Sequence, residues 1–215
     1  MENKLTMKKV FVGYLVFLLI WSLRIILLKP CIDANLTGWT KEIVNGAIKS
    51  AIWLGFSLYL IRKYNQQLPI RNMLKNRINV KLLLLGTAIV VVYQVILMFI
   101  YHKGIYFNPA FQPSQLIGTF LLVGVLEEFV FRGWFLNSLS IFTSETKANL
   151  ISSVLFLLIH YPSYIVGGTP SLILTNSVGI FIASLLFGWS YKKSKSLWVP
   201  IILHMLWDLL SITIV

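Results

Sequence analysis

Seven long apolar stretches limit how this chain can fold more than any other feature of its sequence. A helix needs roughly 20 apolar residues to cross a hydrocarbon core of about 30 Å. The stretches that reach or approach this length are 10–28, 43–61, 82–101, 115–136, 148–161, 171–191 and 197–215. The segments between them are too short for a separate soluble domain. The sequence therefore predicts an all-α polytopic membrane protein with about seven transmembrane helices in a single domain, 1–215.

The composition excludes several classes of protein. Hydrophobic residues make up 57% of the chain and charged residues only 12%, which rules out an ordinary soluble enzyme. The net charge of +12 lies mostly in short gaps between the apolar stretches rather than on one basic face, so a nucleic-acid partner is not expected. Cys31 is the single cysteine, which excludes an internal disulfide and a cluster of thiolate metal ligands.

The distribution of Lys and Arg predicts the orientation of the chain in a cell membrane. A cytoplasmic N-terminus places thirteen of these residues inside and three outside, as the positive-inside rule requires. The expected topology is multi-pass, with the C-terminus outside if all seven stretches cross. Arg24 and Lys49 lie near the outer ends of their stretches, and we expect both to reach the headgroups as anchors.

Two shorter segments carry local expectations. The stretch 148–161 spans only about 21 Å, so its helix should end inside the membrane. The uncharged segment 162–170 that follows is expected to be irregular and to lie beside a cavity next to His160. The segment 69–78 combines basic and apolar residues and is expected to form a short amphipathic helix on the inner leaflet.

Ionisable residues inside apolar helices are costly and indicate function. The stretch 115–136 contains Glu127, Glu128 and Arg132. Glu128 and Arg132 are four residues apart and can pair on one face of a helix. Glu127 points about 100° away from Glu128, so its carboxylate needs a partner from another helix.

The last stretches supply candidates for that partner. His160 ends the stretch 148–161, while His204 and Asp208 share one face of the last helix. Counting about 1.5 Å per residue from the inner ends puts these groups and Glu127 within one slab about 8 Å thick. We therefore expect one polar site in the inner half of the bilayer, open to the cytoplasm, with Arg132 extending toward the cytoplasmic headgroups.

Two kinds of chemistry fit these residue types. A carboxylate and an imidazole that share a water molecule can act as general base and then general acid in amide hydrolysis, while other donors stabilise the oxyanion. Alternatively, Glu127, His160 and His204 match an open three-ligand zinc site. The sequence has neither H-E-x-x-H nor G-x-S-x-G, so a common zincin or a serine mechanism is not supported.

Three motifs resemble those of the CAAX prenyl endopeptidase and bacteriocin-processing (CPBP, or Abi) family of intramembrane proteases. They follow one another in the family's order: Glu127-Glu128-x-x-x-Arg132, Phe156-x-x-x-His160 and His204-x-x-x-Asp208. The resemblance covers about 115–210 and implies a protease core in the last four helices, with 1–110 forming accessory helices. The short, Lys-rich chain looks like a bacterial member.

The resemblance also implies roles for individual residues. Glu127 would be the catalytic carboxylate and His160 its partner in activating water. His204 and Asp208 would lie on the oxyanion side, with Asp208 in place of the Asn of many relatives. An ionised Asp cannot donate a hydrogen bond, so this side chain either carries a proton or orients His204.

The remaining implied roles concern structure and metal. Glu128 and Arg132 would form a structural ion pair. The family is described both as metalloproteases and as glutamate-dependent proteases; we favour a mechanism that requires no metal over one with a divalent ion such as zinc held by Glu127, His160 and His204.

The expected function is hydrolysis of membrane-associated peptides or proteins, by an intramembrane endopeptidase that resembles CAAX proteases. Processing of a pheromone or bacteriocin leader, or self-immunity, would fit a bacterial member. The alternative is a non-catalytic bacteriocin-immunity or membrane scaffold protein. A proton-coupled transporter is disfavoured because the sequence shows no paired repeats with interrupted helices.

Overall fold

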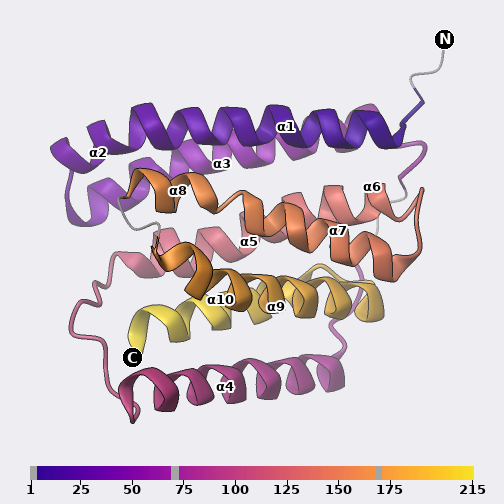
Figure 1. The fold of residues 1–215 in the computed structure, drawn as a ribbon. Coiled ribbons are helices and arrows are strands. Elements are labelled where there is room, and N and C mark those ends of the chain that lie inside the picture. Colours follow the sequence, from indigo (N-terminus) through magenta and orange to yellow (C-terminus); the bar gives the residue numbers. More distant parts are fainter. Residues whose placement is uncertain (1–3, 69–72, 168–170) are drawn as a thin grey trace.

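The computed structural model describes residues 4–68, 73–167 and 171–215, and these ranges form a bundle of helices (Figure 1). The helices, with η marking π-helical stretches, are α1 (Met7–Leu23), η1 (Arg24–Leu28), α2 (Lys29–Asn35), α3 (Gly38–Lys63), α4 (Val80–His102), η3 (Leu116–Val123), α5 (Gly124–Glu128), η4 (Phe129–Leu136), α6 (Asn137–Leu139), α7 (Glu145–Leu158), α8 (Tyr161–Val166), α9 (Ser171–Ser194) and α10 (Trp198–Thr213). The predicted all-α class is confirmed.

Each predicted apolar stretch corresponds to helical structure, and the chain is a polytopic membrane protein. Within the described residues, four helical segments are long and apolar enough to cross a membrane: Met7–Asn35, Gly38–Lys63, Val80–His102 and Glu145–Val166. The last helix, α10, is apolar but has only 16 residues. The stretch around Glu127 forms one continuous helical segment from η3 to α6, in which two π-helical parts enclose α5.

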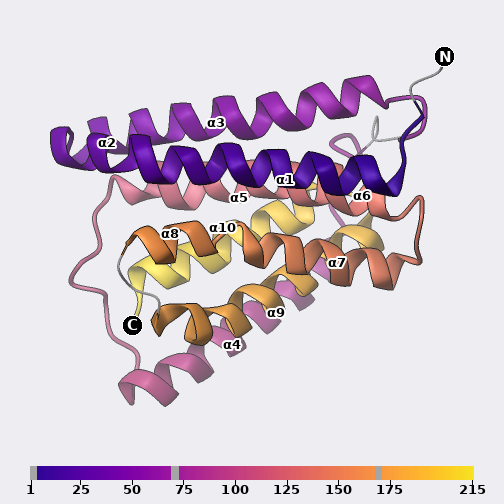
Figure 2. The same ribbon diagram turned by 45° about the horizontal axis from the view of Figure 1, so that its top comes forward.

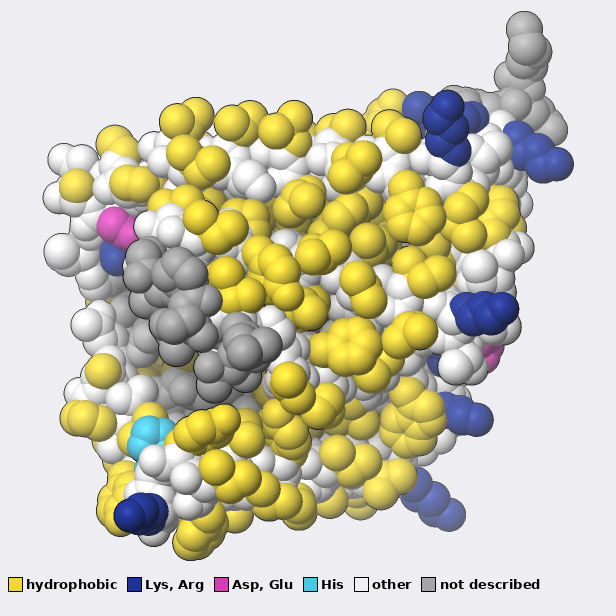
Figure 3. All heavy atoms as spheres, in the orientation of Figure 1, with side chains coloured by type: hydrophobic (Ala, Val, Ile, Leu, Met, Phe, Trp, Pro, Cys, Tyr) yellow, Lys and Arg dark blue, Asp and Glu magenta, His cyan; other side chains and the backbone are white. Residues whose placement is uncertain are grey.

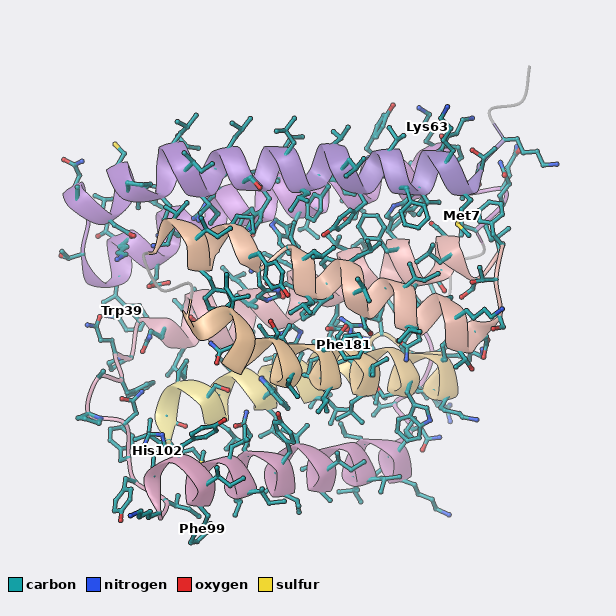
Figure 4. The ribbon with its side chains drawn as sticks, in the orientation of Figure 1. Met7, Trp39, Lys63, Phe99, His102 and Phe181 are labelled. Atoms are coloured by element: carbon teal, nitrogen blue, oxygen red, sulfur yellow. The ribbon has the colours of Figure 1, made fainter. Side chains whose placement is uncertain are left out.

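The two ends of the bundle differ in charge. Figure 4 shows Met7 and Lys63 at one end and Trp39 and His102 at the other. On the face shown in Figure 3, most Lys and Arg side chains gather at the Met7 end, and hydrophobic side chains cover the surface between the ends. We call the end marked by Met7 and Lys63 the Lys-rich end. Its cytoplasmic location stays a prediction.

The segment α5–η4 lies in the middle of the bundle. Figures 1 and 2 show α1 and α3 together along one side and α4 at the opposite edge. Between them, α5 contacts α3 and α10, η4 contacts α3 and α7, and α4 packs on α10 and α9. The two carboxylates of α5 therefore lie where the N-terminal helices meet the C-terminal ones.

Glycine allows the closest of these helix contacts. A Cβ on Gly124 would lie 2.7 Å from Met205 Cγ and 3.1 Å from the Met205 backbone nitrogen. On α9, a Cβ on Gly188 would overlap the Asn149 side chain of α7. Small residues commonly permit such approaches between membrane helices, where packing rather than the hydrophobic effect drives association.

Aromatic side chains fill the core between α1, α3 and η4. Trp53 and Phe131 are almost fully buried, with ring centroids 6.0 Å apart. Phe17 packs edge-on against Trp53 at 4.9 Å, and Phe156 of α7 packs edge-on against Phe131 at 4.9 Å. This packing holds η4 against its neighbours. It therefore also positions the two carboxylates of α5, the helix that directly precedes η4.

Two local expectations require correction. Residues 69–72 lie outside the described residues, and 73–79 form a turn followed by an irregular stretch rather than the expected amphipathic helix. The Met73 carbonyl accepts from the Leu197 N–H at 2.9 Å and the Leu74 carbonyl from Trp198 Nε1 at 2.9 Å. These two backbone carbonyls thus bind the start of α10. In a helix at 73–79 they would instead accept hydrogen bonds within that helix.

The segment after His160 is also more regular than expected. Helix α7 ends at Leu158, and α8 continues from Tyr161 to Val166. Pro162 lies in the first turn of α8, where its missing N–H leaves no helical hydrogen bond unmade. Residues 168–170 of the expected irregular segment lie outside the described residues.

Candidate functional site

Glu128 and Arg132 form the pair predicted from their spacing, but both are buried. Arg132 Nη1 donates to Glu128 Oε1 at 2.8 Å, and only 1% of the arginine side chain is exposed. Its Nη2 donates to the Ser184 carbonyl at 2.6 Å and to Ser184 Oγ at 2.8 Å. The expectation that Arg132 extends to the headgroups is wrong, because α9 supplies oxygen partners inside the bundle.

His204 is held by the same carboxylate. Its Nδ1 lies 2.8 Å from Glu128 Oε1, so the ring donates from Nδ1 and turns Nε2 toward the other groups of the site. That Nε2 lies 3.7 Å from Asp208 Oδ2, as expected for a shared helix face. The Phe187 ring stacks on the imidazole at 4.8 Å. Glu128 therefore does more than pair with Arg132, because it also orients His204.

His160 is oriented by the turn that ends α7. Its Nδ1 lies 2.7 Å from the Phe156 carbonyl oxygen. A carbonyl only accepts hydrogen bonds, so Nδ1 carries the proton and the Nε2 of the neutral ring is left with a lone pair. The Phe156 ring packs against the imidazole at 4.9 Å. The two residues of the Phe156-x-x-x-His160 motif are thus in direct contact.

Glu127 faces both imidazoles. Its Oε2 lies 3.9 Å from His160 Nε2 and 4.0 Å from His204 Nε2. A single water molecule can bridge polar atoms at this separation, with about 2.8 Å to each. Among the described residues, Oε2 of Glu127 has no hydrogen-bond partner, and the same holds for Oδ2 of Asp208. The structure thus brings together all four residues expected to be catalytic, and leaves acceptors free to bind a polar group.

Lys49 of α3 is the nearest cation to Glu127, and the sequence interpretation missed it. Its Nζ lies 2.6 Å from Glu127 Oε1, and 13% of its side chain is exposed. Helix α3 begins at Gly38, five residues before the apolar stretch, so Lys49 lies about 16 Å along the helix. Its ammonium is directed to Glu127 inside the bundle, so it does not act as an anchor. The sequence did contain a signal for this pair: the apolar stretch 43–61 holds the unpaired cation Lys49, and the stretch 115–136 holds the unpaired carboxylate Glu127.

Arg24 is a second cation that was wrongly expected to be an anchor. The helix continues past it to Asn35, and the arginine is buried. Its Nη2 donates to Asn45 Oδ1 on α3, and its guanidinium lies 5.0 Å from the Trp21 ring. This contact joins η1 to α3 one helical turn before Lys49.

The site is closed on the side toward the Lys-rich end. Glu128, Arg132 and Phe187 are buried there, whereas His160 exposes 27% of its side chain. All residues of η3 and α8 are half-buried or exposed. Arg132 fills the side of the site toward the Lys-rich end, and the expected opening to the cytoplasm stays a prediction.

A metal would require Glu127, His160 and His204 to converge on one ion. Among residues 4–68, 73–167 and 171–215, no group of three or more His, Cys, Asp or Glu side chains is arranged to hold a metal. The Lys49 ammonium also occupies Oε1 of Glu127. This donor set does not fit a bound metal as it stands, so the chemistry is derived from the side chains alone.

Comparison with known proteins agrees with the motifs. Residues 109–210 match the family model of the type II CAAX prenyl endopeptidase Rce1-like proteins. No match was found among the curated proteins or among the solved structures. The resemblance to CPBP proteases is confirmed over the matched residues 109–210, which contain all three motifs. At the level of the family, this match supports a CAAX-protease-like intramembrane endopeptidase.

Proposed function

We propose that this chain, whose residues 109–210 are an Rce1-like domain, hydrolyses membrane-associated peptides or proteins with water activated by Glu127 and His160. The observation that carries the proposal is the position of Glu127 Oε2, which faces the Nε2 atoms of two imidazoles and has no other hydrogen-bond partner among the described residues. A buried carboxylate next to two imidazoles is an arrangement suited to general acid–base catalysis.

The first step follows from these positions. A water molecule between Glu127 Oε2 and His160 Nε2 gives its proton to the carboxylate while its oxygen bonds to the scissile carbonyl carbon. The π electrons of the carbonyl move to its oxygen, which becomes the oxyanion of the tetrahedral intermediate. A doubly protonated His204 donates from Nδ1 to Glu128 and from Nε2 to this oxyanion, while Asp208 orients the ring.

The second step returns the proton. Glu127 gives it to the amide nitrogen, an electron pair of the oxyanion re-forms the C=O bond, and the C–N bond breaks with its electron pair staying on the nitrogen. The products are a new carboxyl terminus and a new amino terminus, and Glu127 is again ionised. In this scheme Glu128 and Arg132 position His204 and the end of α5 without contacting the substrate.

The substrate class follows from the setting of the site. The site lies within a bundle of apolar helices, so the substrate must bring its scissile bond to membrane depth. We propose a membrane-associated peptide, such as a pheromone or bacteriocin leader, cut in the cell membrane by a chain with a cytoplasmic N-terminus. In a bacterial host we expect this activity to serve peptide processing or self-immunity.

Peptide analysis in host cells tests the proposal. Peptides in membranes and medium are compared between cells with the wild-type chain and cells with Glu127→Ala, at matched protein abundance. Glu145→Ala is the matched control, because this exposed carboxylate pairs with Lys195 outside the site. Peptides that disappear only with Glu127→Ala support the protease. Identical peptides in all three, together with undiminished immunity, support the non-catalytic alternative.

A further inference from the structure

The pairing of Lys49 with Glu127 gives the N-terminal helices a part in the site. Lys49 belongs to α3, outside the family domain at 109–210. Its ammonium lies 2.6 Å from Glu127 Oε1 and 4.8 Å from the centre of the buried Trp53 ring. The Trp21 ring lies on the same ammonium at 5.7 Å. Two tryptophans therefore hold the cation against the carboxylate.

We propose that Lys49 is a positioning residue for the proteolytic reaction, a role that rests on the proposed function. The two oxygens of Glu127 have separate surroundings: Oε1 is paired with Lys49, while Oε2 faces His160 and His204. The ammonium thus selects Oε2 as the oxygen that takes the proton from water. Without it, the carboxylate can rotate and either oxygen can turn away from the imidazoles.

The positive charge of Lys49 also favours the attack of water on the substrate. When water attacks, its proton neutralises Glu127, and the negative charge passes to the carbonyl oxygen of the substrate. Glu128 keeps its own cation, Arg132, at 2.8 Å throughout. The Lys49 ammonium therefore lies beside one negative charge before the step and near another after it, so the buried site never holds an uncompensated anion.

Kinetics of Lys49 variants test this role in the full-length protein in lipid nanodiscs, with a peptide that the wild type cleaves. Lys49→Met should lower kcat about 100-fold, as a misplaced general base does, and leave KM within threefold. Lys49→Arg keeps the charge and an N–H donor, and should recover at least tenfold over the methionine variant. Lys41→Met is the matched control, since Lys41 lies on the same helix as Lys49 but pairs with Asp33 of α2, and it should stay within twofold.

The rescue by arginine distinguishes positioning from general support of the fold, because a purely structural loss would not restore kcat alone. A kcat of Lys49→Met within threefold of wild type would overturn the proposal. If Lys49→Met does not accumulate, kcat is measured for Lys49→Gln instead, and a value within threefold of wild type overturns the proposal. The proposed function fails separately: a wild type that cuts nothing refutes the protease, whereas an active Lys49→Met beside an inactive Glu127→Gln refutes only the role of Lys49.

Discussion

Replacing Gly124 by alanine should disturb the site through the contact between α5 and α10. The added Cβ would lie 2.7 Å from Met205 Cγ, 3.1 Å from the Met205 nitrogen and 3.4 Å from the Ile201 carbonyl oxygen. The methionine side chain can rotate away, but the two backbone atoms belong to α10 and move only with the helix. Contacts of this kind relax to about 3.5 Å, so the helices must separate by roughly 0.4 Å.

The expected magnitudes follow from this displacement. Overpacking of a core costs about 1–3 kcal/mol, and alanine in place of glycine in a helix returns up to about 1 kcal/mol. The free energy of unfolding should therefore fall by about 1 kcal/mol. The displacement also separates Glu128 Oε1 from His204 Nδ1, now 2.8 Å apart. A misplacement of 1 Å costs about 100-fold in rate, so 0.4 Å should lower kcat roughly sixfold.

Gly133 provides the matched control in the same helical segment. A Cβ there would lie 3.5 Å from Met73 Cε and 4.0 Å from Phe129 Cγ, which are ordinary contacts. Gly133→Ala should raise the free energy of unfolding by about 0.5–1 kcal/mol through helix propensity and leave kcat unchanged. Denaturant unfolding in detergent and peptide cleavage compare the two variants. Equal stability and equal activity of Gly124→Ala and Gly133→Ala would refute the reasoning.

Three further substitutions test contacts around the site. Glu128→Gln leaves the buried Arg132 without a charged partner and should lower the free energy of unfolding by about 3–5 kcal/mol, as measured by denaturant titration; unchanged stability would contradict the buried pair. Ser184→Ala removes one of two hydrogen bonds from Arg132 Nη2 and should cost about 1 kcal/mol, with kcat preserved in the same cleavage assay. Asp208→Asn keeps the shape of a side chain 3.7 Å from His204 Nε2, so kcat should stay within about tenfold; complete loss of cleavage would show that the carboxylate itself is needed.

The sequence predicted the parts of the fold that depend on local pattern. Apolar length located the helices, and four-residue spacing placed Glu128 next to Arg132 and His204 next to Asp208. Depth counting brought Glu127 to the level of His160, because a helix rises by a constant amount per residue. These relations lie within one helix or along one axis.

The contacts between helices could not be predicted in the same way. Lys49 was placed too near a membrane surface because α3 extends beyond its apolar residues to Gly38. Arg132 was expected to extend outward, since only the packing of α9 brings Ser184 to it. The order of helices around α5 depends on close approaches such as Gly124 against Met205, and no sequence pattern specifies which helix faces a given glycine.

Hydrolysis by the purified protein in water enriched in ¹⁸O tests the central claim most directly. Wild type and Glu127→Gln, reconstituted in lipid nanodiscs, are given a mixture of synthetic leader peptides and prenylated C-terminal peptides, and the products are identified by mass spectrometry. The account predicts that wild type generates new carboxyl termini carrying ¹⁸O and that Glu127→Gln generates none. Cleavage by Glu127→Gln at the wild-type rate, or no cleavage by wild type, would contradict it.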